Sequence, residues 1–260
     1  MWNDAVDLRD FYRTSLGQVA QRTIRSRIRT FWDDVSGLNV LGFGYAIPYL
    51  LPFRDEAQRV IAAMPAQQGV LHWPSDGAGA VTLCDETEIP LPDVSVDRVL
   101  MVHGLECSEQ LRPMLREIWR VLADGGRLLA VVPNRRGIWA RLDRTPFGHG
   151  YPYTPGQLSR LLRDTLFTPT RIDHALFVPP SRSRMVIASA PAWENIGSRW
   201  FPRFSGVLMI EAGKEIYAAT PEPAGLRRRS RYVEVAPRAN RSIASVRHGL
   251  AAMDPDKEAS

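Results

Sequence analysis

The sequence has few cysteines and no long hydrophobic run. Its 260 residues include two cysteines, Cys84 and Cys107, which provide neither a disulfide framework nor zinc-ligand spacing. No apolar run approaches the length of a membrane span, and the first residues carry Asp4, Asp7 and Asp10 in place of the apolar core of a signal peptide. We therefore expect a cytoplasmic protein with no metal site and no membrane contact, in which both cysteines are reduced and lie in the packing or at the rim of the fold.

A strong overall charge bias is also lacking, because 33 basic side chains face 28 acidic ones and the net charge is +5. The basic excess gathers in residues 220–260, where arginines stand among Pro, Ser and Ala. Because this segment has too few apolar side chains to form a core, we expect a disordered tail. Two interpretations stay open for this tail, a solvated segment and an arm that contacts RNA. The remaining residues, 1–219, suffice for one globular domain that begins with a helical lead-in.

Ser95–Asn134 reads as strand, helix and strand. Val99–Val102 is a continuous apolar run, typical of a strand that is buried on both faces of a parallel sheet. Apolar residues then recur at helical spacing as far as Leu122, and Asp124–Gly126 is expected to cap the end of that helix. The pattern predicts half of a doubly wound α/β sheet, in which ligands lie at the carboxyl ends of strands, here near His103.

Further elements are predicted on both sides of this unit. A short helix over Asp7–Tyr12 precedes a longer one that runs from a capping box at Ser15 to about Trp32. A second capping box at Thr154 begins a helix that extends to about Arg163. Other strands are expected over residues 38–41, 58–63, 80–84, 170–178 and 206–212, and residues 181–200 are mostly helical by pattern, with an interruption at Pro191.

A glycine-rich turn is predicted directly after the first strand. Gly42–Ala46 follows Leu38–Leu41 and leads into a helix start. Such a turn brings backbone N–H groups close to a ligand, because glycine has no Cβ to block the approach. Asp85 follows another predicted strand in the same way, so we expect it to lie at the same edge of the sheet.

The assembled pattern resembles the class I S-adenosylmethionine-dependent methyltransferases, in particular the methyltransferase type 11, ubiquinone-methyltransferase-like group. The likeness extends over residues 38–214 and is most specific in the runs IPLPDVSVDRVLMVHGLE and LREIWRVLADGGRLLAVVPN. The resemblance implies a Rossmann-like sheet of seven strands with the last strand antiparallel. It also implies a transferase that moves a methyl group from S-adenosylmethionine to an acceptor that the sequence does not identify.

The resemblance also assigns residues to the cofactor. Gly42 and Gly44 would border its methionine moiety, and Asp85 would accept a hydrogen bond from the adenine amino group. His103 would lie beneath the sulfonium. The full set of residues carried over is Gly42, Phe43, Gly44, Asp85, Glu86 and His103.

Three further residues are candidates for contact with the acceptor: Glu106, His149 and Tyr151. His149 lies in a Gly/Pro/aromatic loop, over residues 135–153, that could cover the site. No catalytic residue is assigned, because methyl transfer mainly needs the nucleophile, methyl group and sulfur held in line, and a base depends on the acceptor.

The sequence departs from the family pattern at two acids. Val40 stands where an acid usually opens the glycine motif, and Val60–Pro65 has no acid to hold the ribose hydroxyls. The loss of a charge-assisted contact of that kind costs roughly 1.5–3 kcal/mol of affinity, unless Gln67 or Gln68 replaces it. An alternative function is therefore kept: a catalytically inactive protein of the methyltransferase fold that binds a protein partner as a subunit or adapter.

Overall fold

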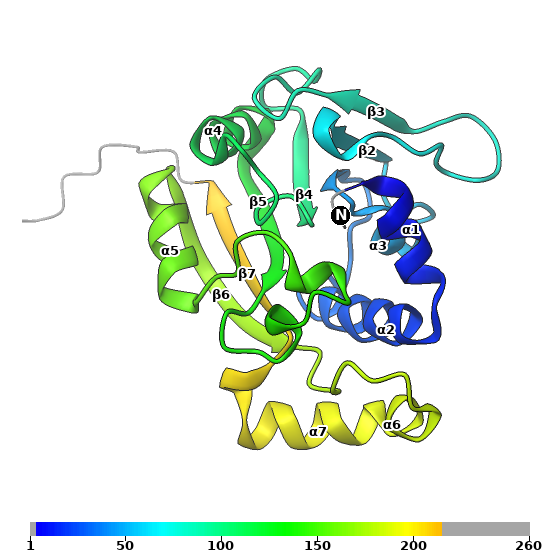
Figure 1. Ribbon diagram of the computed structural model, residues 1–260. Coiled ribbons are helices and arrows are strands. Elements are labelled where there is room, and N and C mark those ends of the chain that lie inside the picture. The colour runs from blue at the N-terminus through cyan, green and yellow to red at the C-terminus, as the bar shows by residue number, and fades with distance from the viewer. Residues whose placement is uncertain (1–3, 215–260) are drawn as a thin grey trace, which may run out of the picture. The chain divides into compact units, whose positions relative to one another are not determined.

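The computed structural model describes residues 4–214, which fold around one seven-stranded sheet (Figure 1). The strand order is β3-β2-β1-β4-β5-β7-β6, and β7 runs antiparallel to both of its neighbours. This is the predicted Rossmann-like sheet with an antiparallel last strand. The strands are β1 (Asn39–Gly44), β2 (Arg59–Pro65), β3 (Val81–Cys84), β4 (Val96–Val102), β5 (Leu122–Pro133), β6 (Phe167–Ala175) and β7 (Val207–Lys214).

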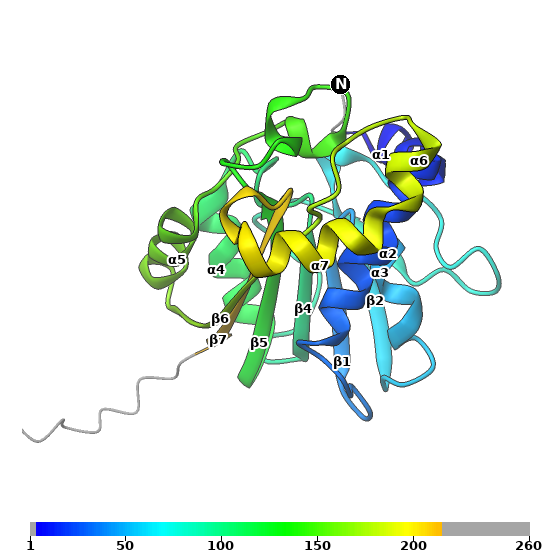
Figure 2. The same cartoon turned by 90° about the horizontal axis from the view of Figure 1, so that it is seen from below.

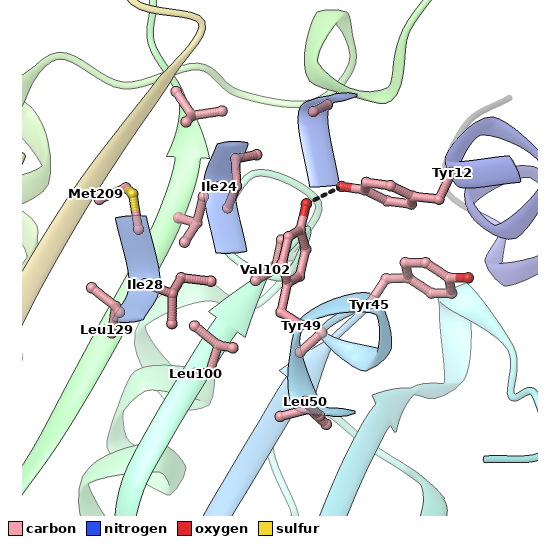
Figure 3. Close-up of a cluster of buried hydrophobic side chains, with 14 of the residues drawn as sticks. Tyr12, Ile24, Ile28, Tyr45, Tyr49, Leu50, Leu100, Val102, Leu129 and Met209 are labelled. Atoms are coloured by element: carbon pink, nitrogen blue, oxygen red, sulfur yellow. Dashed lines mark hydrogen bonds between the residues drawn. The ribbon is translucent and has the colours of Figure 1, made fainter. Parts of the chain in front are cut away.

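Helices cover both faces of the sheet. One face packs against the first three helices and the other packs against α4 and α5 (Figure 1). Successive β4 side chains alternate between these layers, as the pleat requires, with Leu100 and Val102 facing Ile24 and Ile28 (Figure 3). The helices are α1 (Ala5–Arg13), α2 (Ser15–Arg29), α3 (Ile47–Leu50), α4 (Leu111–Val121), α5 (Pro155–Asp164), α6 (Arg184–Ala188) and α7 (Ala190–Trp200).

Helix starts match the sequence closely but not at every residue. The capping box at Thr154 is confirmed, because its side chain and that of Gln157 bond reciprocally to the backbone. The cap of α2 is Thr14 rather than Ser15, since the Thr14 hydroxyl accepts the Gly17 N–H. Pro191 lies in the first turn of α7 and begins that helix instead of interrupting one.

The turn at Asp124–Gly126 differs from its prediction. Helix α4 already ends at Val121, and these residues lie within β5. They form an irregularity where the register between β4 and β5 shifts, and Gly125 has φ 74°. A glycine with positive φ suits a helix C-cap and a strand bulge equally well, so the residue type alone does not distinguish the two.

The structure does not describe the predicted basic tail over 220–260, so the proposed RNA contact of that tail lies outside the described residues. Within residues 4–214, each helix is too short or too polar to traverse a bilayer.

Candidate functional site

The predicted glycine turn begins later than the sequence suggests. Strand β1 extends through Gly44, so Gly42 and Phe43 are strand residues and the turn starts at Gly44, whose φ is +75°. A Cβ on Gly44 would lie 2.5 Å from the carbonyl oxygen of Val102, and one on Gly42 would lie 2.5 Å from Leu50 Cδ1. Glycine is therefore needed at both positions because neighbouring segments of the chain lie where a Cβ would be. Phe43 is buried on the α4 side of the sheet.

A buried chain of hydrogen bonds ends at the carboxyl end of β4. The Tyr49 hydroxyl donates to Tyr12 Oη at 2.8 Å (Figure 3), and Tyr12 Oη lies 2.8 Å from His103 Nε2. His103 Nδ1 lies 3.1 Å from Glu106 Oε1. Since Tyr49 donates to Tyr12, Tyr12 directs its own proton to His103 Nε2, and the histidine proton then lies on Nδ1, facing the Glu106 carboxylate.

The tyrosines of this cluster stay protonated at neutral pH. Burial is the main cause that raises the pKa of Tyr12 well above its usual value, and it also raises the pKa of Tyr49. Burial raises the pKa of Tyr45, whose ring stacks on that of Tyr12 (Figure 3), to about 12. The hydroxyls therefore act as neutral hydrogen-bond groups and not as phenolate nucleophiles.

Side chains from three other segments enclose His103. Gln68, which follows β2, donates from Nε2 to the His103 carbonyl oxygen. The Phe147 ring lies 4.9 Å from the imidazole, and Tyr12 approaches from α1. His103 itself has φ 53°, an unusual conformation for a residue with a Cβ. The position predicted to lie beneath a sulfonium is thus covered by the chain's own side chains.

The two acids after β3 have different environments. Asp85 is exposed and accepts hydrogen bonds from the Thr87 hydroxyl and N–H, which lower the pKa of its carboxyl group. Glu86 is buried and accepts the Gln67 amide at 2.9 Å and the Gln110 N–H at 2.5 Å. Glu86 therefore fixes the loop before α4, and Gln67 binds Glu86 in this structure.

The predicted acceptor residues are only partly brought together. Glu106 lies with His103, and its carbonyl oxygen accepts the Tyr151 N–H at 2.9 Å. The Tyr151 side chain points to solvent and is about three-quarters exposed, at 75%. His149 Nε2 bonds to the Asp143 carbonyl oxygen at 2.8 Å, within its own loop. The loop over 135–153 thus reaches the site through its backbone at Tyr151.

Three buried polar atoms of Gln68 and of the segment that follows His103 lack a hydrogen-bond partner among the described residues: Gln68 Oε1, Glu106 Oε2 and Ser108 Oγ. Buried polar atoms are nearly always satisfied by protein, water or a ligand. The site therefore fits an additional polar group next to Glu106. Within residues 4–214, no cluster of three or more His, Cys, Asp or Glu side chains could hold a metal ion.

The cysteines have the packing environment that the sequence suggests. Cys84 belongs to the core on the α4 side, and burial raises the pKa of its thiol to about 11. Burial also raises the pKa of Cys107. Neither thiol is activated as a nucleophile.

Tyr12 and Phe147 were not predicted as site residues. Tyr12 is 91 positions away from His103 in the chain. In the sequence, Tyr12 is recognisable only as a member of the apolar side of the first helix, together with Leu8 and Phe11.

Comparisons with known proteins agree with the fold. Residues 42–130 match the family model described as a methyltransferase domain. The chain is 28% identical over 136 residues to the ubiquinone/menaquinone biosynthesis C-methyltransferase UbiE of Rubrivivax gelatinosus, an alignment that covers 52% of each protein. The chain thus spans about half the length of that curated relative.

Two solved structures share the fold at low sequence identity. A SAM-dependent methyltransferase from Thermotoga maritima superposes with a TM-score of 0.56 at 15% identity, covering 80% of this chain and 94% of that one. In a complex from Haloferax volcanii, a methyltransferase bound to the Trm112 activator gives a TM-score of 0.57 at 15% identity, with coverage of 82% and 96%.

Proposed function

We propose that the chain is a class I S-adenosylmethionine-dependent methyltransferase, which transfers a methyl group from S-adenosylmethionine to an acceptor at the carboxyl edge of its sheet. The match of residues 42–130 to a methyltransferase domain and the similarity to UbiE support the proposal. One observation carries the proposal: polar side chains gather at the ends of β3 and β4, the edge at which open α/β sheets bind ligands.

Each polar residue has a separate role in this proposal. S-adenosylmethionine supplies an electrophilic methyl group on a positively charged sulfur. Asp85, exposed at the end of β3, would accept a hydrogen bond from its adenine amino group. The unpartnered Glu106 Oε2 and Ser108 Oγ would face its polar or cationic groups.

His103 is the candidate base. Glu106 holds the imidazole with its proton on Nδ1, which leaves Nε2 as a proton acceptor. In this structure, Nε2 receives the Tyr12 hydroxyl. When Tyr12 withdraws, a hydroxyl or acidic C–H of the acceptor could present its proton to the same nitrogen. The proposal therefore includes a movement of α1 that exposes His103.

A calorimetric titration with S-adenosylhomocysteine tests the proposal. We expect the wild type to bind, and Asp85→Ala to bind roughly 10- to 150-fold more weakly, because a hydrogen bond to a charged group is lost. Asp55→Ala removes another exposed carboxylate, between β1 and β2, and should leave the affinity unchanged. No heat at millimolar ligand would contradict the proposal.

A second function is favoured by the filled space around the glycines. Leu50 fills the space next to Gly42 where another residue would have its Cβ. The Tyr12 hydroxyl is hydrogen-bonded to His103 Nε2, so that nitrogen is not available to an acceptor. A protein that keeps this arrangement permanently would be an inactive binding subunit. Tyr12→Ala distinguishes the two: an enzyme gated by α1 should bind S-adenosylhomocysteine at least as tightly after the change, whereas a permanently closed fold should bind it in neither form.

A further inference from the structure

Helices α6 and α7 and the following turn, Pro202–Phe204, expose large apolar side chains. Of the fifteen large apolar residues that are exposed within the described chain, six lie between positions 185 and 204. We call these six residues the α7 surface: Met185, Trp193, Ile196, Trp200, Phe201 and Phe204. Met185 and Trp200 are 82% and 69% exposed. Apolar residues are normally exposed singly, so such a concentration indicates an interaction site.

The exposed stripe differs from the side by which α7 packs on the protein. Gly197 packs closely on Phe177, since a Cβ there would lie 2.3 Å from the ring. Trp193, Ile196 and Trp200 follow the spacing i, i+3, i+7 and share one side of the helix, which borders the packed side because Gly197 lies four residues after Trp193 and three before Trp200. Helix α7 lies across the front of the molecule in Figure 2, with no other element over it.

The charges around the stripe are almost entirely positive. Residues 181–205 contain four arginines and one acidic residue, Glu194. The Glu194 carboxylate is turned inward and accepts the N–H groups of Leu176 and Phe177 at 3.2 and 2.6 Å. The arginines are all exposed: Arg182, Arg184, Arg199 and Arg203.

Basic residues of α2 adjoin the same helix. A groove of about 440 Å³ lies between α2 and α7 and is lined by Arg22, Arg27, Glu194 and Asn195, among others. The α7 surface thus combines exposed indole, phenyl and aliphatic groups with a positively charged surround.

From this combination we propose that the α7 surface docks on an anionic lipid membrane. Trp and Phe side chains partition to the boundary between headgroups and acyl chains, and arginines on the same element attract anionic headgroups. This departs from the absence of membrane contact expected from the sequence, which considered only spanning segments. The connection that carries α7 leaves β6, which runs parallel to β5, so it begins at the same edge of the sheet as the candidate site.

The composition disfavours two other occupants. A two-fold contact with a second copy would bring the same arginines together without exposed carboxylates to pair with them. An RNA would pair with the arginines and stack on the aromatic rings, but it would not bury the aliphatic side chains of Met185 and Ile196. The boundary between lipid headgroups and acyl chains offers contacts to the aliphatic, aromatic and cationic groups together.

Co-sedimentation of the full chain with vesicles tests the proposal. We expect binding to vesicles of equal parts phosphatidylcholine and phosphatidylglycerol, and weaker binding to phosphatidylcholine alone. The double variant Ile196→Ser/Trp200→Ser should lower the partition coefficient by at least about tenfold, because two apolar side chains no longer insert. The matched variant Leu51→Ser/Leu83→Ser removes two apolar residues of similar exposure elsewhere and should bind like the wild type.

Fluorescence separates insertion of α7 from charge attraction elsewhere in the chain. Brominated acyl chains should quench wild-type tryptophan emission more strongly than that of Trp200→Phe, although Trp200→Phe keeps nearly full binding. The proposal is overturned if the double variant binds vesicles like the wild type, if the quenching of Trp200→Phe equals that of the wild type, or if the double substitution converts a dimer into a monomer instead. Vesicle binding requires no methyl transfer, so this outcome is independent of the proposed enzyme activity.

Discussion

The carboxyl edge of the sheet and the α7 surface differ in which side chains are buried: polar groups are buried at the edge, and apolar groups are exposed on the α7 surface. At the edge, His103, Glu106 and the Tyr12 hydroxyl are buried, whereas the Trp200 and Phe204 rings of the α7 surface are mostly exposed to solvent. Each arrangement reverses the usual preference of its residue types. The edge compensates internally, because its polar groups bond to one another, and only a few atoms such as Glu106 Oε2 remain unpaired. The α7 surface has no internal compensation, so we expect substitutions to damage the fold at the edge and to damage binding at α7.

The largest effect should follow Gly44→Ala. Its Cβ would meet the Val102 carbonyl oxygen at 2.5 Å in a backbone with φ +75°, so overlap and strain add. We expect the free energy of unfolding to fall by about 3–5 kcal/mol in urea titrations. Gly197→Ala on α7 should cost less, about 1–3 kcal/mol, because its Cβ overlaps Phe177 Cβ and Cγ but its backbone does not have the positive φ of Gly44.

Gly125→Ala provides the matched control for backbone strain. Its φ is +74°, but nothing lies within 4 Å of its added Cβ. It should therefore show the strain alone, about 1 kcal/mol. If Gly44→Ala destabilises the protein no more than Gly125→Ala does, the close approach of β1 to β4 is not a constraint on the fold.

Tyr12→Phe should have the next largest effect on stability. The change leaves His103 Nε2 without its hydroxyl partner and the Tyr49 hydroxyl without an acceptor. Unfolding in urea should show a loss of about 1–3 kcal/mol, the range for buried groups left unsatisfied. Tyr45→Phe removes the hydroxyl from the ring that stacks on Tyr12, outside this hydrogen-bond chain, and should cost clearly less. Equal losses in the two variants would mean that the hydrogen bonds of the Tyr12 hydroxyl stabilise this edge no more than a hydroxyl outside the chain does.

The sequence was sufficient for the architecture but not for the contacts within the site. The apolar runs at β4 and β5, with the helix between them, predicted the sheet, because parallel strands buried on both faces have a distinctive pattern. The contact of Tyr12 with His103 depends on how α1 docks, and local periodicity carries no information about that. Gln67 and Gln68 were considered as replacements for a ribose-binding acid, and they bond instead to Glu86 and the His103 carbonyl oxygen.

The exposed stripe of α7 was also beyond the sequence, for a different reason. Apolar residues at helical spacing usually indicate a buried face, and Trp193, Ile196 and Trp200 have that spacing. In the structure, the small Gly197 packs against Phe177, and the large residues face outward. Periodicity identifies a helix side but does not identify what covers it.

Trp200→Ser sharpens the contrast between the two regions. Since Trp200 is mostly exposed, its replacement should change the free energy of unfolding by no more than about 0.5 kcal/mol. The comparison with Tyr12→Phe in the same urea titration measures the contrast directly. A loss above about 1 kcal/mol would show that the Trp200 indole stabilises the fold. The α7 surface would then contribute to folding stability and not only to binding.

The smallest effect concerns His174, which links the two regions. Its Nδ1 lies 3.1 Å from the hydroxyl of Ser205, the residue that joins the α7 surface to β7. Burial lowers the pKa of His174 below its usual 6.5. As the pH falls below 6.5, the unfolded chain therefore binds a proton at this position before the folded protein does, and stability decreases. Urea unfolding from pH 7 to pH 5 should show a shallower decrease for His174→Asn than for the wild type, whereas parallel curves would mean that the histidine titrates alike in both states.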